Sequence, residues 1–183
     1  VGSEMCIRDR IKQKAARIKL MIFDVDGVLT DGTIWIDDQG REQKGFNVKD
    51  GFGLKCLMKG GIRVAVITSR RSGAVARRAG ELGIEEVYQG VSDKRIPFFK
   101  ILQEQKLKKD QAGYMGDDLP DLALLREVGL SVTVADAAQE IKDRVDFITK
   151  SRGGEGAVRE VCEIILKSQK KWEGIVSSFE AKD

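Results

Sequence analysis

Two aspartates separated by one residue, Asp24 and Asp26, are the side chains of this sequence best placed to do chemistry. They end an apolar run, residues 19–25, that predicts a strand buried in a parallel sheet. Two carboxylates at such a position lose much of their hydration, so a cation or strong hydrogen-bond donors must compensate. Gly27 allows the chain to turn away and leave both acids at the mouth of a crevice. The pair therefore indicates a catalytic or metal site.

Further polar side chains follow other predicted strands, and the carboxyl ends of parallel strands share one edge of a sheet. Thr68 ends a second strand, Lys94 begins a helix, and Asp117 follows a third strand. Carboxylate oxygens of Asp24 and Asp117 suit Mg²⁺, which prefers few carboxylates together with water. Thr68 and Lys94 suit phosphoryl oxygens, because one donates a hydrogen bond and the other supplies a positive charge. Each residue alone could be an ordinary surface or strand-end side chain; together they predict phosphate chemistry with a divalent cation.

Strands and helices alternate along the chain and would position these side chains. Strands are expected at residues 19–25, 62–68, 86–88, 111–115, 130–134 and 146–148, and helices at 50–59, 72–82, 92–106, 119–127, 137–144 and 156–169. This order predicts right-handed βαβ units and a doubly wound, Rossmann-like parallel sheet flanked by helices, an α/β fold. Residues 33–48 alternate around a turn signal and predict a protruding β-hairpin. Asp50 and Ser92 are the expected caps of the helices that they begin.

Composition excludes several kinds of function. The 183 residues carry a net charge of only +3 and no basic stripe with interleaved aromatic residues, so nucleic acid is not an expected partner. No apolar run approaches the roughly 20 residues of a membrane span. The absence of histidine removes Ser-His and Cys-His catalysis and the usual zinc sites. The dispersed Cys6, Cys56 and Cys162 favour packed thiols in a reducing, cytoplasmic compartment.

The order of the motifs resembles that of the haloacid dehalogenase-like phosphatase superfamily, over residues 19–169. The matching motifs are Asp24-Val-Asp26-Gly27, Ile67-Thr68, Lys94 and Gly116-Asp117-Asp118-Leu-Pro-Asp121. Within the superfamily, segments 29–32, 46–51, 67–70, 88–90 and 153–160 resemble the 3-deoxy-D-manno-octulosonate 8-phosphate phosphatases. Relatives of these enzymes act on nine-carbon sugar acid 9-phosphates. Ser69 stands where a glycine is expected, which affects the expected shape of that loop rather than the chemistry.

The resemblance implies a role for each matching residue. Asp24 would attack phosphorus and form an aspartyl phosphate, and Asp26 would protonate the leaving oxygen and later deprotonate water. Thr68 and Lys94 complete the expected catalytic set, with Asp121 orienting Lys94. The expected Mg²⁺ ligands are Asp24, the main-chain carbonyl of Asp26, Asp117 and, through water, Asp118. The expected substrate contacts are Gly27, Thr30, Lys94 and Arg70, whose guanidinium suits the carboxylate of a sugar acid.

The short segments between the motifs leave no room for a lid domain. We therefore expect a capless domain whose open crevice is completed by another subunit through the hairpin, and the resemblance implies a homotetramer. Three alternatives stay open: a nine-carbon sugar acid phosphate as substrate, a phosphorylatable receiver-like switch, and a catalytically silent oligomerisation module. Arg70 favours the eight-carbon substrate, because the nine-carbon enzymes tend to carry an acid at this position.

One domain is expected over residues 11–183, with a C-terminal helix and tail over residues 156–183. Residues 1–10 contain no apolar core of a secretory signal and look unrelated to the rest of the sequence, so they are predicted to be a non-native or disordered leader. Residues 11–18 are expected to form a lead-in turn or short helix. Residues 153–156 are either a simple loop before a helix or a segment that covers the substrate.

Overall fold

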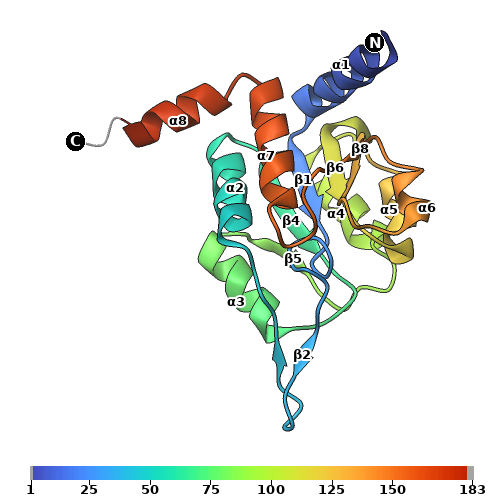
Figure 1. Ribbon diagram of the computed structural model, residues 1–183, viewed down its shortest axis with the longest axis vertical. Coiled ribbons are helices and arrows are strands. Elements are labelled where there is room, and N and C mark those ends of the chain that lie inside the picture. The colour runs from blue at the N-terminus through green and yellow to red at the C-terminus, as the bar shows by residue number, and fades with distance from the viewer. Residues whose placement is uncertain (1, 181–183) are drawn as a thin grey trace.

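A six-stranded parallel sheet lies at the centre of the computed structural model, which describes residues 2–180 (Figure 1). Its strands are β1 (Leu20–Phe23), β4 (Arg63–Ile67), β5 (Glu86–Tyr88), β6 (Ala112–Met115), β7 (Leu130–Thr133) and β8 (Phe147–Ile148). They lie in the order β5-β4-β1-β6-β7-β8. Phe23 of β1 lies opposite Val66 of β4 and Met115 of β6. Because the chain winds outward from β1 in both directions, the predicted doubly wound topology is confirmed.

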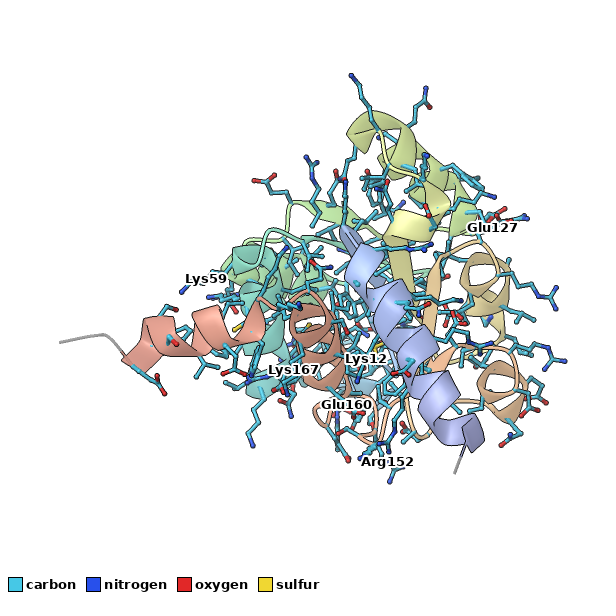
Figure 2. All side chains as sticks on the ribbon, turned by 90° about the horizontal axis from the view of Figure 1, so that it is seen from above. Lys12, Lys59, Glu127, Arg152, Glu160 and Lys167 are labelled. Atoms are coloured by element: carbon cyan, nitrogen blue, oxygen red, sulfur yellow. The ribbon has the colours of Figure 1, made fainter. Side chains whose placement is uncertain are left out.

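Helices cover both faces of the sheet. One layer contains α1 (Gly2–Arg17), α2 (Val48–Lys59), α3 (Gly73–Leu82) and α7 (Ala157–Ser168); the other contains α4 (Arg95–Gln105), α5 (Leu122–Leu125) and α6 (Gln139–Lys142). Alternate residues of β1 join the two cores: Met21 and Phe23 pack in the first, Leu20 and Ile22 in the second. Charged side chains of both signs, such as Lys12, Lys59 and Glu160, lie around the outside of the layers (Figure 2).

The hairpin consists of β2 (Trp35–Ile36) and β3 (Glu42–Gln43), which pair antiparallel and extend away from the sheet (Figure 1). Its strands are shorter than predicted, and Trp35 and Ile36 are exposed. Within the described chain, only the hairpin and α2 separate β1 from β4, and only α3 and β5 separate β4 from α4. The capless architecture is therefore confirmed.

Two predicted helix caps are wrong. Asn47, not Asp50, caps α2: its side chain accepts hydrogen bonds from the backbone N–H groups of Lys49 and Asp50. The helix begins earlier than predicted because an extended Asn can reach these first-turn donors directly. Similarly, α4 begins at Arg95 rather than near Ser92, and the carboxylate of Asp93 accepts the backbone N–H of Arg95 at 3.0 Å.

Asp50 instead stabilises the start of α7. It is buried, and its carboxylate accepts the backbone N–H groups of Gly156 at 3.2 Å and Arg159 at 2.8 Å. These donors belong to the first turn of α7, where N–H groups have no partner within the helix. Asp50 thus connects two elements that lie far apart in the sequence.

The two ends of the chain differ from the expectations. Helix α1 runs without interruption from Gly2, because its Lys- and Ala-rich second half is a good helix former and elongation costs little once a helix exists. From Gly2 onward the structure therefore has a helix and not the disordered leader that was one of the two expectations for residues 1–10. The other expectation, that these residues are non-native, stays a prediction. The side chain of Cys6 and residues 181–183 lie outside what the structure describes.

A second C-terminal helix, α8 (Trp172–Glu180), was not predicted. Lys170 adopts a left-handed conformation after α7, and α8 then extends from the body of the protein (Figure 1). Ile175 packs into the first core, and the ring of Phe179 lies 5.4 Å from that of Phe52 in α2.

Cys56 and Cys162 are buried free thiols. Between residues 2 and 180, every helix is too short or too polar to cross a membrane.

Candidate active site

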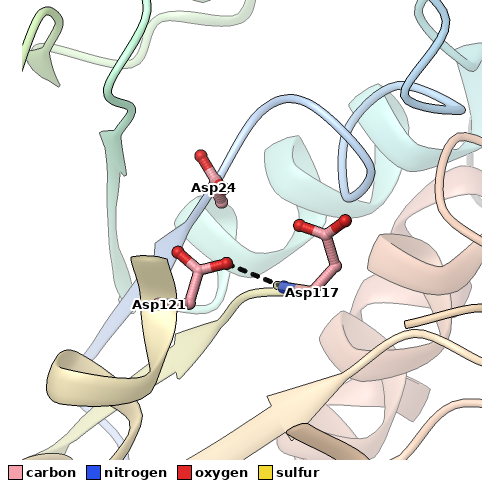
Figure 3. Close-up of side chains that lie close together, drawn as sticks. All are labelled: Asp24, Asp117 and Asp121. Carbon is pink, nitrogen blue, oxygen red and sulfur yellow. Dashed lines mark hydrogen bonds between the residues drawn. The ribbon is translucent and has the colours of Figure 1, made fainter. Parts of the chain in front are cut away.

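Four aspartates gather at the carboxyl edge of the sheet. Asp24 directly follows β1, Asp117 and Asp118 follow β6, and Asp121 ends the short 3₁₀ helix η2 (Leu119–Asp121). Carboxylate oxygens of Asp24, Asp117 and Asp121 lie within 4.8 Å of one another (Figure 3). Neighbouring parallel strands thus bring together acids that are far apart in the sequence, as the rule for strand ends predicts.

Lys94 places a buried ammonium among these acids. Its Nζ lies 2.9 Å from Oδ2 of Asp24 and 2.6 Å from Oδ1 of Asp121, and it donates to the hydroxyl of Tyr114 at 3.1 Å. Burial disfavours the charged lysine, but Asp24 and Asp121 more than offset this and raise the pKa of Lys94. Lys94 is therefore an ammonium at neutral pH and can face a phosphoryl group.

Asp121 acts as the anchor of this cluster. Its Oδ1 accepts the hydroxyl of Tyr114 at 2.5 Å, and its Oδ2 accepts the backbone N–H groups of Asp117 at 2.9 Å and Asp118 at 3.2 Å. Figure 3 shows the bond to the Asp117 nitrogen. Because both oxygens are engaged, Asp121 holds Lys94 and the loop after β6, in agreement with its expected orienting role.

The remaining carboxylates carry an electrostatic penalty that a cation can relieve. Burial raises the pKa of Asp24 to about 7, with a further increase from Asp121 and partial compensation by Lys94. Burial also raises the pKa of Asp117 to about 8, and Asp121, Asp24 and Asp118 add to this shift. Two acids that resist ionisation side by side fit a divalent cation, because its charge favours both ionised forms. Their oxygen donors suit Mg²⁺.

The loop after β1 needs a glycine at position 27. Gly27 has a φ of +83°, and a Cβ there would lie 2.0 Å from Oδ2 of Asp117. The expected substrate contact Thr30 is not brought into the crevice: its hydroxyl accepts the N–H groups of Gly27 at 3.3 Å and Gly32 at 3.1 Å and donates to the Val25 carbonyl at 3.4 Å. The side chain is buried because three backbone groups of the loop converge on it, so Thr30 shapes the loop.

Residues 153–156 support this loop from outside. The N–H of Gly154 donates to the carbonyl of Val28 at 3.0 Å, and a Cβ at Gly153 would lie 1.8 Å from the carbonyl oxygen of Gly27. The two loops are therefore packed backbone against backbone. Of the two interpretations of residues 153–156, the fixed loop before a helix agrees with these contacts.

A chain of opposite charges lies on the other side of the crevice. Lys44, which follows β3, forms ion pairs with Asp26 and with Glu42, the latter at 3.2 Å. Arg70 donates from Nη2 to Oε2 of Glu42 at 2.5 Å, and its Nε lies 3.9 Å from Oδ2 of Asp26. The hydrogen bond from Arg70 lowers the pKa of Glu42 to about 2, so Glu42 is ionised. The base of the hairpin thus contacts both Asp26 and Arg70.

One crevice contains nearly all of the predicted site residues. Its lining includes Asp24, Asp26, Gly27, Thr68, Arg70, Lys94, Asp117 and Asp118, together with Gly32, Ser69, Pro120 and Asp121. Sequence reasoning missed Tyr114, Glu42 and Lys44. Tyr114 had a usable signal, since a tyrosine inside a buried strand needs a partner for its hydroxyl. Nothing in the sequence pattern pairs Lys44 with Asp26.

A parallel sheet in this strand order, with acids and a lysine at its carboxyl edge, defines a haloacid dehalogenase-like hydrolase, and the model of that family matches residues 81–161. The chain is 46% identical to 3-deoxy-D-manno-octulosonate 8-phosphate phosphatase of Yersinia pestis over 168 residues, which cover 92% of this chain and 90% of the relative. The chain belongs to the family of 3-deoxy-D-manno-octulosonate 8-phosphate phosphatases.

Solved structures agree with this assignment. The crystal structure of the Yersinia pestis phosphatase superposes with a TM-score of 0.90 at 47% identity, covering 91% of this chain and 90% of that one. The phosphatase of Moraxella catarrhalis, in complex with a magnesium ion, a phosphate ion and a KDO molecule, gives a TM-score of 0.91 at 43% identity over 93% of this chain and 98% of that one. These relatives are enzymes, which favours the phosphatase over the receiver-like switch and the silent module.

Proposed function

We propose that this protein hydrolyses 3-deoxy-D-manno-octulosonate 8-phosphate to the free sugar acid and phosphate, a step in the synthesis of lipopolysaccharide precursors. The observation that carries this proposal is the convergence of Asp24, Asp117 and Lys94 on one crevice that also contains Arg70. The names of the relatives, and the ligands of the Moraxella catarrhalis structure, support the same substrate.

In the proposed reaction Asp24 is the nucleophile. The backbone N–H of Val25 donates to its Oδ1 at 2.7 Å, and Lys94 lies beside its Oδ2. Attack on phosphorus forms an aspartyl phosphate, while the bond to the sugar oxygen breaks and that oxygen takes a proton from Asp26. Water then attacks the same phosphorus and gives a proton to Asp26, the bond to Asp24 breaks, and phosphate leaves.

The other groups in the crevice stabilise charge. Mg²⁺, held by Asp24, Asp117, the main-chain carbonyl of Asp26 and, through water, Asp118, would neutralise charge on the transferring phosphoryl group. Lys94 contributes a second positive charge, and Tyr114 and Asp121 hold it in position. We assign the hydroxyl of Thr68, which lines the crevice, to a phosphoryl oxygen as a donor. Gly27 also lines the crevice, but its N–H already donates to the hydroxyl of Thr30.

Arg70 is the proposed ligand of the substrate carboxylate. Its side chain is about half exposed at the crevice and already pairs with a carboxylate, that of Glu42. A guanidinium binds carboxylates through two parallel hydrogen bonds, which suits a 2-keto sugar acid. The arginine favours the eight-carbon over the nine-carbon substrate, because the nine-carbon enzymes tend to carry an acid at this position.

We also propose that the protein acts as a homotetramer in the cytoplasm. The hairpin exposes Ile34, Trp35 and Ile36 together, more apolar surface than a short hairpin in water is expected to carry. An assembly through this hairpin would bury these side chains and close the open crevice. The buried free thiols of Cys56 and Cys162 suit a reducing compartment. Light scattering at micromolar concentration tests the assembly; a fully active monomer would contradict it.

A panel of phosphate esters tests the proposed function. The purified protein with Mg²⁺ is assayed for phosphate release from eight- and nine-carbon sugar acid phosphates and from sugar phosphates without a carboxylate. We expect the highest kcat/KM with the eight-carbon acid, and loss of turnover in Asp24→Asn. Retained turnover in that variant would require another nucleophile, and a preference for esters without a carboxylate would overturn the substrate assignment.

A further inference from the structure

Lys44, at the base of the hairpin, is a charged side chain that the proposed chemistry does not use. Its side chain has an exposed fraction of 0%, although the hairpin itself projects into solvent. An ammonium in such a place costs several kcal/mol of lost hydration unless it is paired. Lys44 is paired twice, with Asp26 and with Glu42. The hairpin therefore places the buried ammonium of Lys44 against the carboxylate of Asp26.

The contact distinguishes the two oxygens of Asp26. Lys44 engages Oδ1, whereas the nearest charged group to Oδ2 is Nε of Arg70, at the looser distance of 3.9 Å. A carboxylate held at one oxygen loses rotational freedom about its side-chain bonds and presents the other oxygen in a fixed direction. A proton donor must lie within hydrogen-bond reach of the leaving oxygen, so small changes in its direction affect the rate strongly.

The neighbouring charges hold Lys44 itself in place. Its second contact is Glu42 at 3.2 Å, and Glu42 in turn accepts the short hydrogen bond from Arg70. Asp26, Lys44, Glu42 and Arg70 therefore alternate in sign, so each charge has an opposite neighbour. This arrangement fixes the ammonium from both sides rather than leaving it to follow the hairpin.

We propose that Lys44 is a positioning residue for the proton-transfer step: it holds Oδ1 of Asp26 so that Oδ2 faces the leaving oxygen of the substrate. The inference rests on the proposed role of Asp26 in the phosphatase reaction. It assigns to the hairpin base a function inside its own subunit, in addition to any part in assembly.

The test compares two leaving groups in Lys44→Met, which keeps an unbranched side chain out to the Cε position and removes the ammonium. An alkyl phosphate without a carboxylate has a poor leaving group that needs the proton, whereas p-nitrophenyl phosphate releases a stable phenolate that does not. The ratio kcat/KM reports the steps up to release of the leaving group. Since general acid catalysis contributes roughly 10²- to 10⁴-fold, we expect a loss of about 10- to 100-fold with the alkyl ester and less than about 3-fold with the aryl ester.

Three further variants make the result specific. In an Asp26→Asn background, Lys44→Met should cause no additional loss with the alkyl ester, because the group that it positions is already removed. Lys44→Arg keeps the charge on a different head group and should give a smaller loss with the same preference for the aryl ester. Arg41→Ala, which removes an exposed charge from the same hairpin, is the matched control and should leave both ratios unchanged.

Equal losses with both esters would overturn the proposal and indicate a structural role. Additive losses in the double variant would also overturn it. The aryl phosphate rate shows in each case whether the variant has folded. A failure of the proposed substrate is a separate outcome, because it would be seen in the wild-type panel and would not alter the alkyl-to-aryl comparison.

Discussion

Replacing Asp50 with alanine tests whether the two loops of the active site depend on a carboxylate outside it. Asp50 accepts the N–H groups of Gly156 and Arg159, and Gly154 in the same segment bonds to the loop after β1. Asp50→Ala leaves two partly buried donors without their partner and removes the N-terminal cap of α7. Together these losses amount to about 2–4 kcal/mol of unfolding free energy.

For a chain of this length such a loss lowers Tm by roughly 5–15 °C, which a thermal melt followed by circular dichroism resolves. Burial raises the pKa of Asp50, so its charge is itself unfavourable and the acceptor oxygens supply the stabilisation. Asp50→Asn keeps one acceptor and should give an intermediate Tm.

Asn47→Ala is the matched control for Asp50→Ala. Asn47 caps only α2, so its loss should cost about 1 kcal/mol and leave kcat/KM close to wild type. Asp50→Ala should lower kcat/KM as well, because residues 153–156 would no longer be held against the loop after β1. An alanine variant that melts with the wild type and retains full activity would refute this reasoning.

Three further predictions concern the site itself. Gly27→Ala should abolish activity, because a Cβ there meets Oδ2 of Asp117 at 2.0 Å; Gly40→Ala, at a similar positive φ with open space around it, is the control and should retain activity in the same phosphate-release assay. Arg70→Ala should raise KM for the sugar acid phosphate by about 10- to 100-fold and change KM for an aryl phosphate little, since only the first carries a carboxylate; equal increases would remove this role from Arg70. Without Mg²⁺, the free energy of unfolding should fall as pH rises from about 4 to about 8. On folding, the pKa of Asp24 rises from 3.8 to about 7 and that of Asp117 from 3.8 to about 8. The folded protein therefore binds more protons than the unfolded chain in this pH range, and raising the pH favours the unfolded chain. Saturating Mg²⁺ should make the free energy of unfolding depend less on pH. Thermal melts across this pH range, with chelator and with Mg²⁺, measure the effect, and parallel pH profiles would contradict the prediction.

Local patterns predicted the sheet and most of the site. Buried runs such as residues 62–68 and glycines at helix ends such as Gly83 identify elements through neighbouring residues alone, and β4 and α3 lie where they were expected. Asp24, Lys94 and Asp117 then followed from one geometric rule, that polar residues after parallel strands meet at one edge.

Tertiary contacts account for what the sequence could not predict. Asp50 is a residue type that often caps the helix it begins, but packing brings the first turn of α7 within reach of its carboxylate. Asn47 caps α2 instead. Lys44 finds Asp26 only because the hairpin returns toward the sheet. Helix α8 did carry a local signal, the helical spacing of Trp172, Ile175 and Phe179. The lysines at 170 and 171 separate this apolar pattern from that of α7.

The packing of residues 153–156 against the loop after β1 has a consequence for protein synthesis. Every acid and the lysine of the site precede residue 122, yet the loop that bears the nucleophile rests on a segment translated much later. A nascent chain on the ribosome would therefore present all the reactive groups before it could hold them in working geometry. We expect phosphatase activity to arise only after residues 153–156 have left the exit tunnel, so that a chain terminated before them is inactive.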